Sequence, residues 1–203
     1  MRSQPPTWPI YVIPYNRAGT ALRFRIAQLQ SRAEHATSSC PDDSVQPRAI
    51  PQLHDPALDA LCFYLVDDHR IVSYAAVVHK FIQHDRENFS IAGLSCVATD
   101  PDYRHHGRGM CVVGAATNYI EQSNADFGIF TCDPELESFY GRAGRWMTMP
   151  TVRLIGSHDN AALSSASLHK IVLMRFFSEK ARLATKRFEN TTVSLDFPIG
   201  QFL

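Results

Sequence analysis

Alternating apolar runs and segments of helical periodicity predict a mixed α/β fold. Apolar runs indicate strands at residues 9–16, 61–66, 71–79, 89–99, 126–132, 147–155 and 169–177. Apolar residues at three- and four-residue steps predict helices over residues 20–36 and 107–122. A third, short helix is predicted within residues 133–146. This order gives an antiparallel run followed by one central βαβ unit.

Turn residues divide these elements. The sequence Asp-Asp-His-Arg at 67–70 indicates a hairpin. In the third helix, Asp133 can cap the N-terminus, Pro134 suits the first helical position, and Gly144 can end the helix in the left-handed conformation.

Residues 38–57 and 190–203 stand apart from this pattern. The first segment is rich in proline and aspartate, which is typical of a lid, a binding loop or a floppy insertion. The second is an apolar tail, and its Leu195, Phe197 and Phe202 can dock at a substrate cleft or on the partner subunit of a homodimer. We expect residues 1–203 to form a single domain.

Composition narrows the function. Twenty basic and twenty acidic residues give a formal net charge of zero, which argues against a dedicated nucleic-acid binder. The N-terminus has no secretory signal, and no run of eighteen apolar residues predicts a membrane helix. Five cysteines without a CxxC pair indicate reduced thiols in a cytoplasmic protein and argue against a metal site.

The motif with the clearest chemistry is Arg-His-His-Gly-Arg-Gly at 104–109. It lies between a strand that ends at Thr99 and a helix that starts near Gly107. Free N–H groups at a helix N-terminus bind anions, and glycines let the backbone approach a phosphate closely. The guanidinium groups of Arg104 and Arg108 add positive charge.

Other interpretations of this motif remain. It is neither a Walker A loop nor a Rossmann fingerprint, so a glycine-rich turn with solvated charges is the structural alternative. His105 and His106 are adjacent in sequence, and a metal site would need distant partners; exposed loop histidines are the expected state. Nucleic-acid binding would need a wider basic surface.

Residues 97–110 and the later Phe-Tyr-Gly-Arg-Ala-Gly-Arg-Trp at 139–146 together resemble the GCN5-related N-acetyltransferase (GNAT) superfamily. The resemblance implies a GNAT fold that binds acetyl-CoA. It places the pyrophosphate on backbone amides and the pantetheine arm along the strand end. It thus implies cofactor contacts at Val97, Ala98, Thr99, Arg104, His105, His106, Gly107, Arg108, Gly109 and Met110. Asp133 stands where the family often has a cofactor asparagine.

The wider layout resembles aminoglycoside 2′-N-acetyltransferases, which acetylate and inactivate antibiotics. Ser95 stands where typical relatives have a glutamate, and Gln201 and Leu203 stand where they have a C-terminal Asp-x-Trp. The substrate site would therefore contain fewer acidic side chains than in typical relatives. Fewer acidic side chains predict a less cationic amino-sugar substrate, as in the kasugamycin-modifying members.

The expected reaction is direct attack of a small-molecule amine on acetyl-CoA. The resemblance makes Tyr140 the acid for the departing thiolate, although its helical spacing also suits a core tyrosine. No base stands out. Ser95 can orient a water, and water alone is the alternative. Carboxylate candidates for the base are Asp42, Asp43, Asp55, Asp196 and the C-terminus at Leu203. The residues expected to bind the substrate are Asp42, Asp43, Asp55, Gln201 and Leu203.

Overall fold

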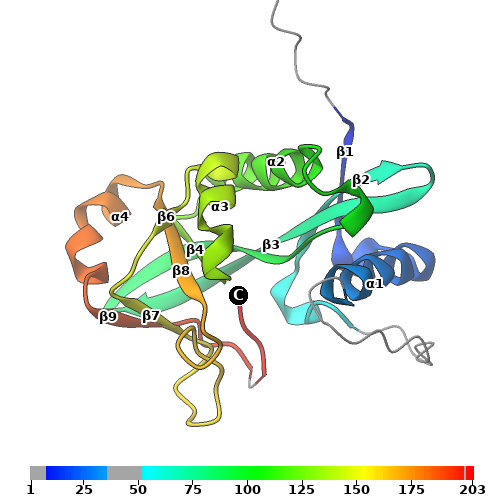
Figure 1. The fold of residues 1–203 in the computed structure, drawn as a ribbon. Helices are drawn as coiled ribbons and strands as arrows, with labels where there is room; N and C mark the ends of the chain where they lie inside the picture. The colour runs from blue at the N-terminus through cyan, green and yellow to red at the C-terminus, as the bar shows by residue number, and fades with distance from the viewer. Residues whose placement is uncertain (1–7, 36–51, 199) are drawn as a thin grey trace, which may run out of the picture. The chain divides into compact units, whose positions relative to one another are not determined.

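A computed structural model describes residues 8–35, 52–198 and 200–203. The described chain forms two compact units. Unit 1 comprises Met1–Ala76 and Cys96–Ala115, and unit 2 comprises Val77–Ser95 and Ala116–Leu203. Figure 1 traces the elements in chain order by colour. Three elements pass through both units: β3 (Arg70–His84), β4 (Glu87–Thr99) and α2 (Arg108–Gln122).

Unit 1 also contains β1 (Ile10–Pro14), α1 (Thr20–His35) and β2 (Leu61–Asp67), with short 3-10 helices η1 (Tyr15–Arg17), η2 (Pro56–Leu58) and η3 (Pro101–Tyr103). Its strands follow the order β1-β2-β3-β4, and β1 pairs antiparallel with β2. The β2–β3 turn uses Asp68 and His69 at φ 44° and 60°, which confirms the predicted hairpin. Ile26 and Leu29 of α1 are buried, as their spacing predicts.

Unit 2 adds β5 (Phe127–Cys132), α3 (Glu137–Gly144), β6 (Met147–Thr148), β7 (Val152–Ile155), β8 (Ile171–Phe176), α4 (Glu179–Leu183) and β9 (Thr191–Ser194). Two 3-10 helices, η4 (Pro134–Leu136) and η5 (Thr185–Phe188), complete it. Its strands follow the order β3-β4-β5-β8-β6, while β7 and β9 form a separate parallel pair. The β4–β5 pair is parallel, and β5–β8 and β6–β8 are antiparallel. The fold is therefore mixed α/β, as predicted.

Aromatic side chains form much of the unit 2 core. Phe127 lies at its centre, with ring centroids 4.8 Å from Phe188 and 5.5 Å from Phe89. Trp146 packs edge-on against Phe130 at 4.7 Å, and its Nε1 donates to Thr117 Oγ1 at 3.0 Å. Such aromatic pairs favour edge-to-face geometry and bury large apolar areas.

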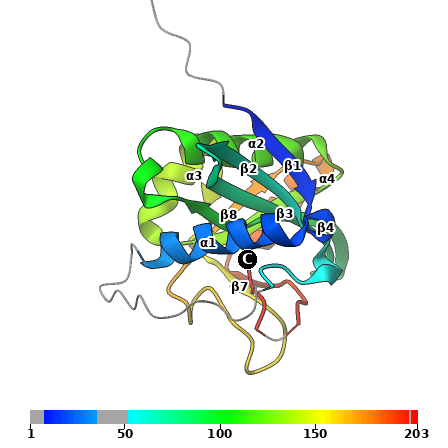
Figure 2. The same ribbon diagram turned by 90° about the vertical axis from the view of Figure 1, so that its right-hand side faces the viewer.

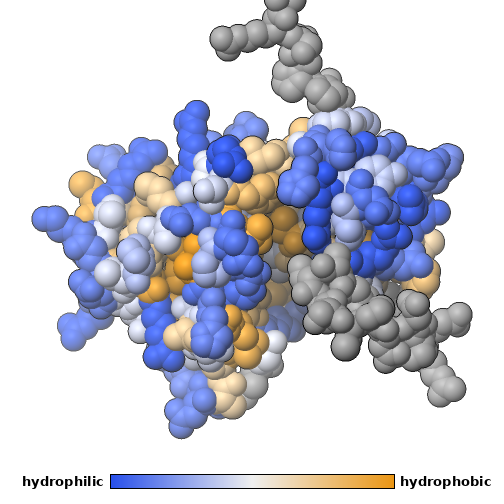
Figure 3. Space-filling view, in the orientation of Figure 1, coloured by the Kyte–Doolittle hydropathy of each residue, from blue (hydrophilic) through white to orange (hydrophobic). Residues whose placement is uncertain are grey.

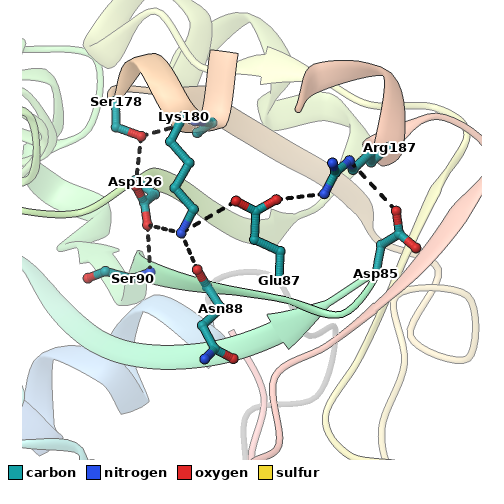
Figure 4. Close-up of polar contacts among 9 residues, drawn as sticks. Asp85, Glu87, Asn88, Ser90, Asp126, Ser178, Lys180 and Arg187 are labelled. Carbon is teal, nitrogen blue, oxygen red and sulfur yellow. Dashed lines mark hydrogen bonds and ion pairs between the residues drawn. The ribbon is translucent and has the colours of Figure 1, made fainter. Parts of the chain in front are cut away.

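A polar network connects the β3–β4 hairpin of unit 2 to α4 and η5 (Figure 4). Asp126 accepts from Ser90 N–H at 2.9 Å and from Ser178 Oγ at 2.7 Å. Lys180 lies 3.6 Å from Asp126 and 3.9 Å from Glu87. Glu87 also pairs with Arg187 at 2.6 Å. Because charges of both signs alternate along the network, each carboxylate has a cationic neighbour.

Three predicted details are wrong. The predicted strand at 147–155 is two short strands, because residues 149–151 turn between β6 and β7. The left-handed residue that ends α3 is Arg145, with φ 55°, and Gly144 is the last helical residue. Asp133 precedes η4 but makes no side-chain capping bond. Its Oδ1 instead accepts from Lys170 Nζ at 2.5 Å.

Candidate functional site

The end of β4 in unit 1 contains a backbone irregularity. Cys96 adopts φ 51°, a left-handed conformation that is uncommon for a residue within a strand and typical of a bulge or a strained site. The side-chain amide of Gln30, on α1, donates to the Cys96 carbonyl at 2.7 Å. This bond holds the irregular backbone in place. No sequence pattern predicts this conformation at Cys96, because cysteine has no particular preference for it.

The strand end that was predicted to bind pantetheine is fixed to β3. Ser73 Oγ lies 3.0 Å from Thr99 Oγ1 and 3.4 Å from the carbonyl of Ala98, and Asp100 N–H donates to the Val72 carbonyl. Ala98 is buried, and Val97 is half-buried. The direction of the strand is therefore set before the loop begins.

The loop after β4 is tied to α1. Asp100 accepts from the N–H of Asp102, and Arg32 pairs with Asp100 at 3.0 Å and with Asp102 at 2.9 Å. The Arg104 guanidinium donates to the carbonyls of Thr99 and Ala33, at 3.3 and 3.1 Å. Arg104 thus connects the strand end to the last turns of α1.

Two of the residues between Arg104 and α2 have left-handed backbone conformations that lead into a helix N-terminus. His105 and Gly107 have φ 63° and +80°, and α2 begins at Arg108. His105, His106 and Gly107 are exposed. The N–H groups of a first helical turn have no acceptor within the helix and point outward along its axis. Together with the absent Cβ at Gly107, this backbone fits a phosphate group. Gly109 and Met110 lie in that first turn.

Arg108 is held by side chains of unit 1. Its Nη2 lies 2.5 Å from Asp67 Oδ2, and its guanidinium lies over the rings of Tyr103 and Trp8, with centroids at 4.6 and 5.3 Å. Its Nε is buried and has no hydrogen-bond partner among the described residues. Both predicted arginines thus have partners within the protein, so the backbone N–H groups are the principal donors that the loop offers.

Tyr140 in unit 2 is buried, with 5% of its surface exposed. Its ring packs against Phe130 and Phe139, each at a centroid distance of 5.0 Å. Burial, reinforced by the nearby Cys132 and Asp133, raises the pKa of the phenol above its usual value. The hydroxyl therefore stays protonated at neutral pH and can serve as a donor.

The other site residues predicted from the sequence lie on separate elements or outside the described residues. Asp42 and Asp43 lie outside the described residues. Asp55 accepts from Ala57 N–H and so caps η2 in unit 1. Ser95 lies in β4, directly before the irregular Cys96. In unit 2, Asp196 accepts from Ser194 Oγ at 2.8 Å.

In the C-terminal part of unit 2, Leu195, Phe197 and Leu203 are buried, whereas Asp196, Pro198 and Gly200 are exposed. Figure 2 shows the tail running beside β7, where Leu195 N–H donates to the Ile155 carbonyl. A Cβ added at Gly156 would lie 2.8 Å from the Gln201 carbonyl oxygen. Leu203 is 9% exposed and reaches β5. Figure 3 shows apolar surface on this face of the molecule. The exposed large apolar side chains of unit 2 include Leu136 and Met147.

Unit 1 contains a buried histidine, His54, that no sequence motif indicated. His54 is 4% exposed, and its Nε2 lies 2.8 Å from Tyr74 Oη, which donates to Cys62 Sγ at 3.1 Å. Burial lowers the pKa of His54 from 6.5 to about 4. Its imidazole is therefore neutral at physiological pH.

Comparison with known proteins identifies the fold. No protein-family model and no curated protein matches the sequence. Among solved structures, YhbS of Escherichia coli, a GNAT family N-acetyltransferase in complex with CoA, matches with TM-score 0.54 and 13% identity. The match covers 93% of this chain and 91% of YhbS. ElaA of Escherichia coli matches with TM-score 0.54 and 12% identity, over 83% of this chain and 99% of ElaA.

A probable N-acyltransferase from Enterococcus faecalis V583 matches with TM-score 0.51 and 15% identity, over 71% of this chain. This chain spans only 33% of that protein's length. At these identities the similarity shows the fold, and it confirms the predicted GNAT acyl-CoA N-acyltransferase fold. None of the described helices is long and apolar enough to cross a membrane.

Proposed function

We propose that this chain is an acetyl-CoA-dependent N-acetyltransferase that acts on a small-molecule amine. The observation that carries the proposal is the junction from β4 to α2 in unit 1. There the left-handed His105 and Gly107 lead into a helix whose first N–H groups are available to an anion. On a GNAT fold, this junction suits the pyrophosphate of coenzyme A.

The proposal assigns one set of residues to cofactor binding and another set to the reaction. Loop amides from Arg104 to Gly109, with the first turn at Met110, would bind the pyrophosphate, and Val97, Ala98 and Thr99 would pair with pantetheine as an added strand. Asp133 is a weaker cofactor candidate, because it already pairs with Lys170. Ser95, Tyr140 and Leu203 would act on the acceptor and the leaving group.

The proposed reaction needs proton transfers and positioning. The neutral amine nitrogen attacks the thioester carbonyl carbon, a C–N bond forms, and the C–S bond breaks. Tyr140 gives its proton to the departing thiolate, and the attacking nitrogen loses a proton to water or to a carboxylate. Holding both reactants together supplies most of the acceleration, so few catalytic side chains are required.

For the acceptor, we propose the amine of an aminoglycoside, at the 2′ position, and an amino sugar of kasugamycin type in particular. Support comes from the sequence. Ser95, Gln201 and Leu203 stand where the aminoglycoside 2′-N-acetyltransferases that this chain resembles have acidic and aromatic groups for highly charged aminoglycosides. Acetylation would then confer antibiotic resistance. Another small amine is the alternative acceptor, and CoA binding without turnover of any amine would instead indicate a non-catalytic module. A homodimer remains a prediction.

The loop can be tested by Gly107→Ala. A Cβ at φ +80° costs about 1–2 kcal/mol, so the loop must rearrange and we expect about tenfold weaker binding of CoA by calorimetry. Gly19→Ala is the matched control, because a Cβ there meets nothing within 4 Å and φ is not positive. Equal CoA affinities of Gly107→Ala and the wild type would contradict a role for this loop.

A further inference from the structure

Trp8 lies against the loop that is proposed to bind the pyrophosphate. A Cβ added at Gly107 would lie 3.7 Å from Cζ3 and 3.8 Å from Cη2 of the indole. The six-membered ring of Trp8 therefore borders the loop at the glycine that has the left-handed backbone. A group bound by the loop amides would have this ring as a neighbour.

The pairing of β1 with β2 brings Trp8 to this place. Ile10 lies opposite Leu65, and the antiparallel register continued by two residues sets Trp8 beside Asp67. Asp67 in turn holds Arg108, the first residue of α2, with 2.5 Å between Oδ2 and Nη2. The sheet thus positions Trp8 at the start of α2, although Trp8 precedes β1 in the chain.

Arg108 connects Trp8 to a second aromatic ring. Its guanidinium carbon lies 5.3 Å from the ring centroid of Trp8 and 4.6 Å from that of Tyr103. Arg70 also lies over Tyr103, at 6.0 Å. A planar guanidinium stacks on aromatic rings, and these contacts restrict the motion of the indole. A ligand of the loop would therefore meet a ring that is already ordered, which lowers the entropy lost on binding.

The indole is not fully covered by these contacts. Trp8 is half-buried, and among the described residues of unit 1 no aromatic ring stacks on it. Tyr11, three residues later, differs because its ring stacks on that of Tyr64 at 5.4 Å. The part of the indole that Arg108 leaves open can therefore pack against a flat, apolar group of a ligand.

We propose that Trp8 is a cofactor-binding residue whose indole stacks on the adenine of coenzyme A. This assignment rests on the proposed function and adds an aromatic side chain to a site that otherwise consists of backbone amides. The adenosine of coenzyme A is joined to the same pyrophosphate, so its base lies within reach of the loop. Aromatic side chains bind nucleobases by stacking, because every base has a π-face.

The test separates the two halves of the cofactor. Calorimetry measures the binding of acetyl-CoA, of its nucleotide half, adenosine 3′-phosphate 5′-diphosphate, and of its other half, 4′-phosphopantetheine. In Trp8→Ala, the dissociation constants of acetyl-CoA and of the nucleotide should rise about tenfold, whereas that of 4′-phosphopantetheine should change less than about twofold. Trp8→Phe keeps an aromatic ring and should bind acetyl-CoA within about threefold of the wild type.

Fluorescence reports on the indole directly. The chain contains two tryptophans, and the other, Trp146, is buried in unit 2 and donates a hydrogen bond to Thr117. Stacking on adenine should therefore quench the emission of Trp8 when acetyl-CoA binds the wild type. Trp8→Phe should lose most of this quenching while it still binds acetyl-CoA.

Tyr11→Ala is the matched control, because it removes an exposed aromatic side chain from β1, directly after Trp8 in the chain. Thermal unfolding of each variant separates weak binding from poor folding. An unchanged dissociation constant of acetyl-CoA in Trp8→Ala, or an equal weakening of 4′-phosphopantetheine, overturns the assignment of Trp8 to adenine alone. A wild type that binds neither acetyl-CoA nor its halves overturns the proposed function and, with it, this assignment.

Discussion

At the scale of single residues, Tyr140 is a core residue for which we also propose a chemical role. It is buried against Phe130 and Phe139, which is what its helical spacing predicts of a core tyrosine. The same burial raises the pKa of its phenol, so the hydroxyl stays protonated at neutral pH but is a weaker acid than an ordinary phenol. The role proposed for Tyr140 is therefore that of a hydrogen-bond donor which gives up its proton only as the C–S bond breaks.

Replacing Tyr140 by phenylalanine should separate the two roles. Tyr140→Phe keeps the ring and removes the proton, so we expect kcat to fall about 100-fold or more while the KM of acetyl-CoA stays within about twofold. Tyr11→Phe, at a tyrosine that is 48% exposed, is the control. A Tyr140→Phe enzyme with full kcat would eliminate the phenol as the acid.

His54 gives the protein a pH-dependent stability. Its folded pKa of about 4 lies below the ordinary 6.5, so between these values the unfolded chain binds a proton that the folded chain does not. Above pH 6.5, the contribution of His54 to the free energy of unfolding should be constant. As the pH drops to about 4, the free energy of unfolding should fall by on the order of 3 kcal/mol. Denaturant titrations at pH 7 and pH 4.5 measure the loss. In His54→Gln it should be smaller, and an identical loss would assign it to other groups.

At the scale of elements, the segment from α3 to Trp146 depends on a close approach. A Cβ at Gly144 would lie 2.5 Å from both Thr117 Oγ1 and Trp146 Nε1, the two atoms of the hydrogen bond that joins Trp146 to α2. Gly141, one turn earlier in α3, has only the Trp146 carbonyl oxygen at 3.8 Å. The two glycines therefore differ in what they tolerate.

Alanine substitutions at these positions should have opposite effects. Gly144→Ala should destabilise the fold by about 2 kcal/mol through overpacking and the lost hydrogen bond. Gly141→Ala should stabilise it by about 0.5–1 kcal/mol, because alanine favours the helix. Chemical denaturation gives both values. Equal changes in the two variants would show that space at Gly144 is not limiting.

The elements also show what a sequence pattern can predict. The β4–loop–α2 junction was predictable because its signals are local: an apolar run, glycines, then helical periodicity. The turn at Asp85 and Arg86, with φ 47° and 65°, lacks the glycine or asparagine that usually marks such a hairpin. The left-handed Cys96 likewise has no local signal, since Gln30 of α1 holds it from 66 residues away.

At the scale of the whole molecule, the fold was predictable and the acceptor chemistry less so. The resemblance at residues 97–110 and 139–146 correctly predicted the GNAT fold. The contact between Thr131 and Leu203 joins residues 72 positions apart, and no spacing rule connects them. Likewise, Arg104 and Arg108 have partners on elements distant in sequence. The sequence alone therefore did not show that both guanidinium groups already contact other protein groups.

The two units carry different parts of the proposed activity. Unit 1 contains the backbone amides that are proposed to bind the pyrophosphate, while unit 2 contains Tyr140, the proposed acid. Mutations should accordingly divide by kinetic parameter: changes in the loop should weaken the binding of acetyl-CoA, and changes at Tyr140 should lower kcat.

The most direct test of the account is acetyl transfer itself. Purified protein is incubated with acetyl-CoA and single amines from a panel of kasugamycin, deoxystreptamine aminoglycosides, spermidine and amino acids, and free thiol and acetylated amine are both quantified. We predict thiol release that requires an amine and equals the acetylated product, with cationic small amines preferred. Thiol release that is independent of every amine, or no release although CoA binds, would contradict the account.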